Sequence, residues 1–133
     1  MSENEPAAMG KGMYWTGVVM SVLPSLMLLM ASAMALSHSD QAVKGFVGQY
    51  GYPESAMFGI GLACLVSTIL YIIPQTAVLG AILLTGYLGG AVATHVHANE
   101  GPMLLAPVIF GALVWGGLFL RDARIRALLP WRK

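Results

Sequence analysis

The chain has 133 residues, of which 57% are hydrophobic and only 10% are charged, whereas ordinary soluble domains carry roughly 25% charged residues. This small number of polar groups could not cover the surface of a water-soluble domain. We therefore expect one integral membrane domain with the lipid bilayer as its main solvent. The net charge of +1 gives no general attraction to nucleic acid. The single cysteine, Cys64, excludes an intrachain disulfide and dithiol redox chemistry.

Four apolar segments are candidate membrane-spanning helices, because about 20 residues at ~1.5 Å per residue cover the ~30 Å hydrocarbon core. They cover residues 13–36, 54–73, 76–97 and 102–120. A polar tail, residues 1–12, precedes them, and a basic tail, residues 121–133, follows them. The sequence therefore predicts an all-α, four-helix transmembrane bundle over residues 13–120.

The first span and the segment after it carry two local signals. Pro24 lies in the middle of the span, where it removes one helical hydrogen bond and predicts a kink. In the polar segment 37–52, Val43, Phe46 and Val47 have the spacing of one helical face. We expect a short amphipathic helix there, lying on the membrane face.

Small residues mark the predicted packing faces of the second and third spans, which the short Pro74-Gln75 connection makes an antiparallel hairpin. These residues are Ala56, Gly59, Ala63 and Ser67 in the second span and Gly86, Gly90 and Ala93 in the third. Small side chains let helices approach closely in lipid. The opposite stripe of the third span, with Leu84, Leu88 and Val92, is then expected to face lipid.

The basic residues predict the topology. Four spans place both termini on one side, where six of the seven Lys and Arg residues lie, and only Lys44 lies on the other side. The positive-inside rule then puts both termini in the cytoplasm. We interpret the basic tail as a topology determinant, and contact between this tail and anionic headgroups is the alternative.

Polar residues that could recognise a ligand gather on the outer face. His38 ends the first span, Glu54 begins the second, and His95 and His97 end the third. Asp40 and Glu100 lie in the adjoining loops. They could converge on a metal, a quinone headgroup or another polar ligand, or they simply lie where water begins. His95 and His97 are about 160° apart on a helix, and the helical wheel favours His97 as the inward residue.

Within the spans, Tyr87 and Thr94 are the candidate ligand-binding side chains, and a hydrogen bond to a neighbouring helix is the alternative role for Tyr87. Tyr71 is expected to anchor the cytoplasmic interface, and Cys64 to fill space as a small apolar side chain. No pair of helices offers histidines at mid-depth, and C-x-x-C and H-E-x-x-H are absent. We therefore expect no haem, flavin or iron–sulfur cofactor.

Several runs of residues resemble the DoxX-like family of small bacterial four-helix membrane proteins. They are Gly51-Tyr52-Pro53, Tyr71-Ile72-Ile73-Pro74, the stretch from Leu84 to His95 with its TGYLGG and ATH runs, and the tail from Leu118 to Pro130. The resemblance implies the four-helix fold and a multi-pass protein of the bacterial inner membrane. The family takes its name from a subunit associated with a thiosulfate:quinone oxidoreductase, and other members are linked to membrane redox and oxidative-stress complexes.

The resemblance also bears on single positions. His95 matches the histidine of the family, whereas many relatives carry Arg where this chain has His97. Relatives often carry Lys near Ala35 and Glu near Cys64, and both positions are uncharged here. Loss of both groups together avoids an unpaired charge in lipid, and any proton or ligand role of that pair is missing from this chain.

The function that the resemblance implies is that of an accessory membrane protein of a quinone-linked redox system. It would have a quinone or lipid-like ligand near the outer face, no redox centre of its own and no catalytic activity on its own. One alternative is a non-enzymatic scaffold or assembly factor that acts through its Gly and Ala faces. Another is a small transporter formed by oligomerisation. The expected partners are the lipid bilayer, a membrane redox protein and further copies of the chain, but not nucleic acid.

Overall fold

The computed structural model describes residues 10–131, and every regular element in that range is helical, which confirms the predicted all-α class. The longest helices are α2 (Lys11–Leu36), α4 (Ala56–Ile72), α5 (Ala77–His97) and α6 (Leu105–Arg121). The shorter elements are α3 (Asp40–Val43), the π-helical turn η1 (Lys44–Gln49), the 3-10 turns Pro74–Thr76 and Gly101–Leu104, and α7 (Ala123–Leu128). Most of the predicted polar tail, 1–12, and the last two residues of the basic tail lie outside the described residues.

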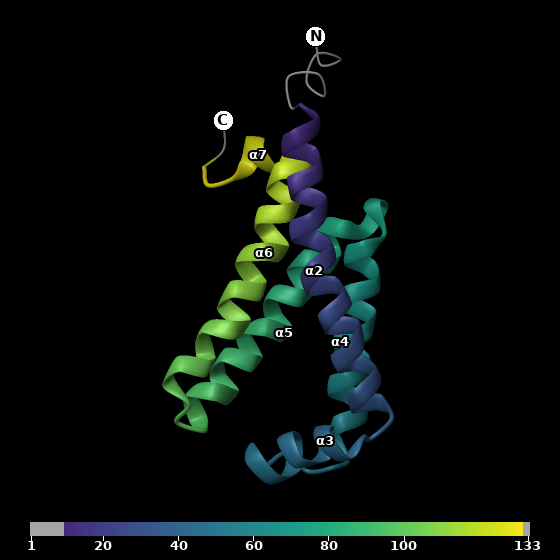
Figure 1. Cartoon of the computed structure of the whole chain (residues 1–133), viewed down its shortest axis with the longest axis vertical. Coiled ribbons are helices and arrows are strands. Elements are labelled where there is room, and N and C mark those ends of the chain that lie inside the picture. Colours follow the sequence, from purple (N-terminus) through teal and green to yellow (C-terminus); the bar gives the residue numbers. More distant parts are fainter. Residues whose placement is uncertain (1–9, 132–133) are drawn as a thin grey trace.

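The long helices pack side by side, with α2 running along most of the molecule (Figure 1). The first half of α2 packs against the end of α6, where Gly17 meets Gly117. Its second half packs against α4, where Ala35 meets Gly61. Helix α5 packs against both α4 and α6. The start of α2 and the end of α6 therefore share one end of the molecule, and α3 lies at the opposite end (Figure 1).

Within residues 10–131, three helical segments are long and apolar enough to cross a membrane: Lys11–Leu36, Pro74–His97 and Gly101–Arg121. Helix α4 is also apolar but has 17 residues. Large apolar side chains on the outer surface of α2 are more than half exposed, among them Val19, Leu23, Leu26 and Met30. Such a surface needs lipid around it, so the chain is a membrane protein with transmembrane helices.

The predicted packing stripes require a correction. A Cβ atom added at Gly59, Gly86 or Gly90 would meet no atom within 4 Å, so these glycines do not mediate close helix contacts. Helix α5 instead turns its leucine face inward, with Leu84 0% and Leu88 5% exposed, and the expectation that this face meets lipid is wrong. Of the other predicted packing residues, Ser67 is buried, Ala56 is partly buried, and Ala63 and Ala93 are exposed.

Other glycines make the close approaches. A Cβ atom at Gly17 would lie 2.7 Å from the carbonyl oxygen of Gly117, and one at Gly61 would lie 3.0 Å from the Cβ of Ala35. A Cβ atom at Gly80 would overlap the backbone of Tyr71 across the α4–α5 hairpin. Real Cβ atoms essentially never approach closer than 3.0 Å, so glycine is required at positions 17 and 80. At Gly61 an added Cβ atom would be tighter than most real contacts, and Ala35 would have to shift slightly.

Tyr71 lies inside the bundle rather than at an interface, so the interface-anchor prediction is wrong. Its side chain is 1% exposed. Its hydroxyl lies 2.6 Å from the carbonyl oxygen of Val114 and 2.9 Å from the Ser21 hydroxyl. The ring can be buried because the hydroxyl finds hydrogen-bond partners on two other helices.

Candidate functional site

A cavity of about 500 Å³ lies between α4, α5 and the η1 segment. Its walls are small or apolar and include Gly59, Ile60 and Ala63 from α4 and Gly86 and Gly90 from α5. The glycines that fail to pack against a helix therefore create this space. The hydroxyl- and imidazole-bearing side chains that also line the cavity are Tyr50, Tyr52, Tyr87, Thr94 and His95.

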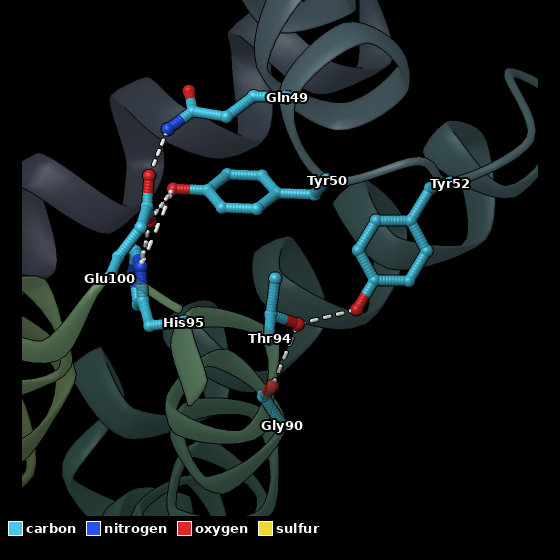
Figure 2. A network of polar contacts seen from close by, with 7 residues as sticks. All are labelled: Gln49, Tyr50, Tyr52, Gly90, Thr94, His95 and Glu100. Atoms are coloured by element: carbon cyan, nitrogen blue, oxygen red, sulfur yellow. Dashed lines mark hydrogen bonds and ion pairs between the residues drawn. The ribbon is translucent and has the colours of Figure 1, made fainter. Parts of the chain in front are cut away.

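A polar network joins the end of α5 to the end of η1 and the residues that follow it (Figure 2). The hydroxyl of Tyr50 donates to Glu100 Oε1 at 2.9 Å and lies 3.4 Å from His95 Nδ1. His95 Nδ1 lies 2.8 Å from the same carboxylate oxygen. Gln49 Nε2 donates to the other oxygen, Oε2. The carboxylate of Glu100 is thus the centre of the network.

A second polar contact closes the cavity beside this network. The Tyr52 hydroxyl is hydrogen-bonded to Thr94 Oγ1, which in turn donates to the carbonyl oxygen of Gly90 at 2.9 Å (Figure 2). Because Thr94 uses its proton on the helix backbone, its oxygen accepts the proton of Tyr52. The segment 49–52 is therefore held against α5 by side-chain hydrogen bonds at two places.

Backbone turns at two helix ends explain how these groups meet. After α5, Asn99 has a left-handed φ of 62°, and the amide of Glu100 donates to the carbonyl oxygen of His95 at 2.9 Å. After α2, His38 has a φ of 53°, and the amide of Ser39 donates to the carbonyl oxygen of Met34 at 3.1 Å. Both are Schellman-type ends. The first brings Glu100 back over His95, and the second directs the chain from α2 into α3.

The electrostatics of the network centre on Glu100, which lies outside the membrane-spanning helices. The hydrogen bond with His95 is the largest cause that lowers the pKa of Glu100 below its ordinary value of 4.5, followed by the bonds from Tyr50 and Gln49. The pKa of Tyr50 is raised, first by burial and then by its bond to Glu100. Glu100 is therefore ionised and Tyr50 protonated at neutral pH.

The predicted ligand-binding residues separate into two groups. His95, Thr94 and Tyr87 line the cavity. The other three, His38, Glu54 and His97, are exposed and do not line it. The helical wheel favours His97 as the inward residue, but His95 lies on the cavity side. Within residues 10–131, no three His, Cys, Asp or Glu side chains group closely enough to hold a metal ion.

The sequence does not identify Tyr50 or Tyr52 as ligand-binding residues, and it places Glu100 only among the polar groups of the outer face. The available signal was the run Tyr50-Gly51-Tyr52, in which two aromatic side chains flank a glycine with a left-handed φ of 75°. The contact between Glu100 and His95, five residues earlier, could not be predicted from helical spacing. It forms because the chain reverses at the left-handed residue Asn99.

A comparison with known protein families supports the resemblance seen in the sequence. A model described as the DoxX-like family matches residues 19–117, which include most of α2 and α6 and all of α4 and α5. No curated protein and no solved structure matches the chain. The matched range includes the cavity and the network around His95. Since the match covers well over half of the chain, the protein belongs to the DoxX-like family.

Proposed function

We propose that the protein is an accessory subunit of a quinone-linked redox system in the bacterial inner membrane. It binds an amphipathic quinone or lipid-like ligand in the cavity beside His95 and contributes no redox centre of its own. Four helices span the membrane, and both termini lie in the cytoplasm. The cavity between α4, α5 and η1 is the observation that carries the proposal.

The cavity suits a molecule with an apolar body and a polar end. Its apolar wall is formed by small side chains, which leave room for rings or an alkyl chain, and its polar groups lie together near the end of α5. Ligand sites generally combine an apolar lining with a few polar groups that orient the ligand. A volume of about 500 Å³ lies in the usual range for such sites, roughly 300–1,000 Å³.

The hydrogen bonds of the network indicate which polar end fits. The ionised carboxylate of Glu100 only accepts hydrogen bonds, so Nδ1 of His95 carries the proton. In neutral His95 the other ring nitrogen, Nε2, is then an acceptor. It is suited to a hydroxyl donor, such as a quinol or a hydroxyl-bearing lipid headgroup.

The four-span topology has support from length and charge. Helix α4 has 17 residues, which gives about 26 Å at ~1.5 Å per residue, and the polar residues Glu54 and Ser55 precede it. It also packs against α2 and α5, both of spanning length. Of the basic residues that the structure describes, Lys11, Arg121, Arg124 and Arg126 lie at the end where α2 begins and α6 ends, and Lys44 lies at the opposite end. By the positive-inside rule, this distribution supports a cytoplasmic location for the first end.

Mass spectrometry of the protein extracted in native lipid tests the ligand. We expect one bound quinone or quinol per chain in the wild type. His95→Gln should lower its occupancy roughly fivefold, because one lost hydrogen bond costs ~1 kcal/mol. His97→Gln is the matched control and should retain the ligand, because His97 is exposed and outside the cavity.

Other results of the same experiment would contradict the proposal. A stable protein partner with no small ligand would favour the scaffold alternative. Equal occupancy in His95→Gln and the wild type would remove His95 from the site. A tightly bound haem, flavin or iron–sulfur cluster would show that the protein has a redox centre of its own.

A further inference from the structure

A second, separate groove of about 270 Å³ lies at the other end of the molecule, between α2, the end of α4 and the end of α6. The side chains of Val22, Leu26, Leu29 and Ile72 form its apolar wall. Val22 is 45% and Leu26 58% exposed, so the groove is open on the outer surface, where lipid lies. None of its residues lines the cavity beside His95.

The hydroxyl groups of the groove are already used within the protein. Ser21 Oγ donates to the carbonyl oxygen of Gly17 at 2.9 Å, and Ser25 Oγ donates to that of Ser21 at 2.7 Å. The Tyr71 hydroxyl lies 2.6 Å from the carbonyl oxygen of Val114. Because these donors are satisfied, the depth of the groove is suited to an apolar chain rather than to a polar molecule.

The mouth of the groove carries a fixed positive charge, Arg121. Its Nε donates to Ser21 Oγ at 3.1 Å, and its guanidinium carbon lies 5.4 Å from the centre of the Tyr71 ring. These two contacts hold the side chain in place. Within residues 10–131, no protein acceptor is hydrogen-bonded to its two terminal nitrogens, which are therefore available to an anion.

The neighbouring arginines are engaged elsewhere. Arg124 makes two hydrogen bonds with the carboxylate of Asp122, at 3.1 and 2.9 Å. Arg126 Nη1 donates to the carbonyl oxygens of Phe119 and Leu120 at 2.7 and 3.1 Å. Among these three arginines, Arg121 alone combines a fixed position, available donors and a groove beside it.

We propose that this groove binds one anionic phospholipid, with its phosphate on Arg121 and one acyl chain along α2. Guanidinium groups are well suited to phosphate oxygens. From Val18 to Leu29 the groove follows α2 for about 16 Å at ~1.5 Å per residue, close to half of the ~30 Å hydrocarbon core. The end of α6 places Arg121 at headgroup depth, where anionic lipids attract basic side chains.

The test uses the full-length protein in phosphatidylcholine nanodiscs, titrated with phosphatidylglycerol and followed by native mass spectrometry. We expect one tightly retained phosphatidylglycerol per chain. Arg121→Gln should weaken its binding at least roughly tenfold, the value of one charge-assisted hydrogen bond. Arg124→Gln is the matched control and should bind as the wild type does, because Arg124 is exposed and paired with Asp122.

A second pair of variants tests the acyl-chain part without changing charge. Leu26→Trp fills the groove from an exposed position and should also weaken retention of the lipid. Leu23→Trp lies on the same helix, is similarly exposed and does not line the groove, so it should have no effect. Wild-type retention of phosphatidylglycerol in Leu26→Trp would overturn the proposal.

Two further outcomes would also overturn it. Equal weakening by Arg121→Gln and Arg124→Gln would mean that general surface charge attracts the lipid. Equal retention of phosphatidylcholine and phosphatidylglycerol by the wild type would mean that the site does not recognise anionic lipid. The proposal is independent of the quinone-type ligand, because Arg121→Gln leaves the residues around His95 unchanged.

Discussion

At the scale of residues, the carboxylate of Glu100 is the group on which the site depends. It accepts hydrogen bonds from Gln49, Tyr50 and His95, and so it joins the end of η1 and the residue after it to the end of α5. One acidic side chain in a short loop thereby fixes the tautomer of His95 and covers one side of the cavity. Protonation of Glu100 would turn one of its oxygens into a hydroxyl donor and so weaken the bonds from these three side chains.

The first residue-scale prediction is a pH dependence. The folded-state pKa of Glu100 lies below the ordinary 4.5, so the network stabilises the docked segment fully above that pH. This stabilisation is lost as the pH falls through the lower, folded-state pKa. We expect hydrogen exchange of residues 44–52, normalised to the intrinsic exchange rate at each pH, to be constant from pH 7 to 5 and to rise below about 4.5.

Glu100→Gln is the control for that prediction. It removes the titrating group, so residues 44–52 should exchange faster than in the wild type at neutral pH and show no added rise in acid. If the wild-type segment loosened between pH 7 and 5, a group other than Glu100 would control it. The same conclusion would follow if the acid-induced rise persisted in Glu100→Gln.

At the scale of elements, the closest helix packing depends on a few glycines. Gly80 allows α5 to pack against the backbone of α4, and Gly117 allows α6 to pack against Ser21 of α2. Ala35 and Cys64, where relatives often carry charges, are both buried, with Ala35 against Gly61 and Cys64 Sγ 3.7 Å from the carbonyl oxygen of Leu28. The α2–α4 interface is therefore apolar at both positions.

The element-scale prediction concerns the α4–α5 hairpin. Gly80→Ala should lower the stability of the protein by on the order of 1–3 kcal/mol, because the added methyl group overlaps the Tyr71 backbone. Gly89→Ala is on the same helix and meets no atom within 4 Å. It should be neutral or slightly stabilising, as alanine is the better helix former. Thermal unfolding in detergent measures both, and equal melting temperatures would refute the close approach at Gly80.

The helical wheel of α5 could not reveal this packing. Small residues occur on two of its sides: Ala77, Gly80 and Ala81 are buried, whereas Gly86 and Gly90 are exposed. Periodicity identifies both sides as suitable for close packing but does not say which one a neighbour occupies. That choice depends on where the Ile73–Thr76 connection directs the helix, and this is a property of the tertiary structure.

At the scale of the whole molecule, length and hydropathy are sufficient to predict the helical class and the approximate ends of the long helices. Residues 13–36 correspond to α2, and residues 76–97 correspond to α5 to within two residues. These quantities carry no information on which face of a helix is buried. For that reason the cavity and its polar network could not be predicted. Both form only where α3 and η1 lie next to α5, and that position is a property of the tertiary structure.

The whole-molecule prediction concerns topology. Cysteines introduced one at a time at His97 and Ala127, both exposed, should react differently with a membrane-impermeant maleimide. We expect the His97→Cys protein to be labelled from the periplasmic side and the Ala127→Cys protein only after the cytoplasm is opened. Cys64 is buried, and Cys64→Ser provides an unreactive background. Labelling of both sites from one side would refute an arrangement with both termini in the cytoplasm.

The central claim, a ligand in the cavity beside His95, is tested most directly by filling the cavity. A Cβ atom added at Gly90 would meet no atom within 4 Å, and Gly90 lines the cavity. Gly89 also faces open space but does not line it. Native mass spectrometry should show that Gly90→Leu loses the bound quinone or quinol and that Gly89→Leu keeps it. Retention of the ligand in Gly90→Leu at the wild-type level would contradict the account.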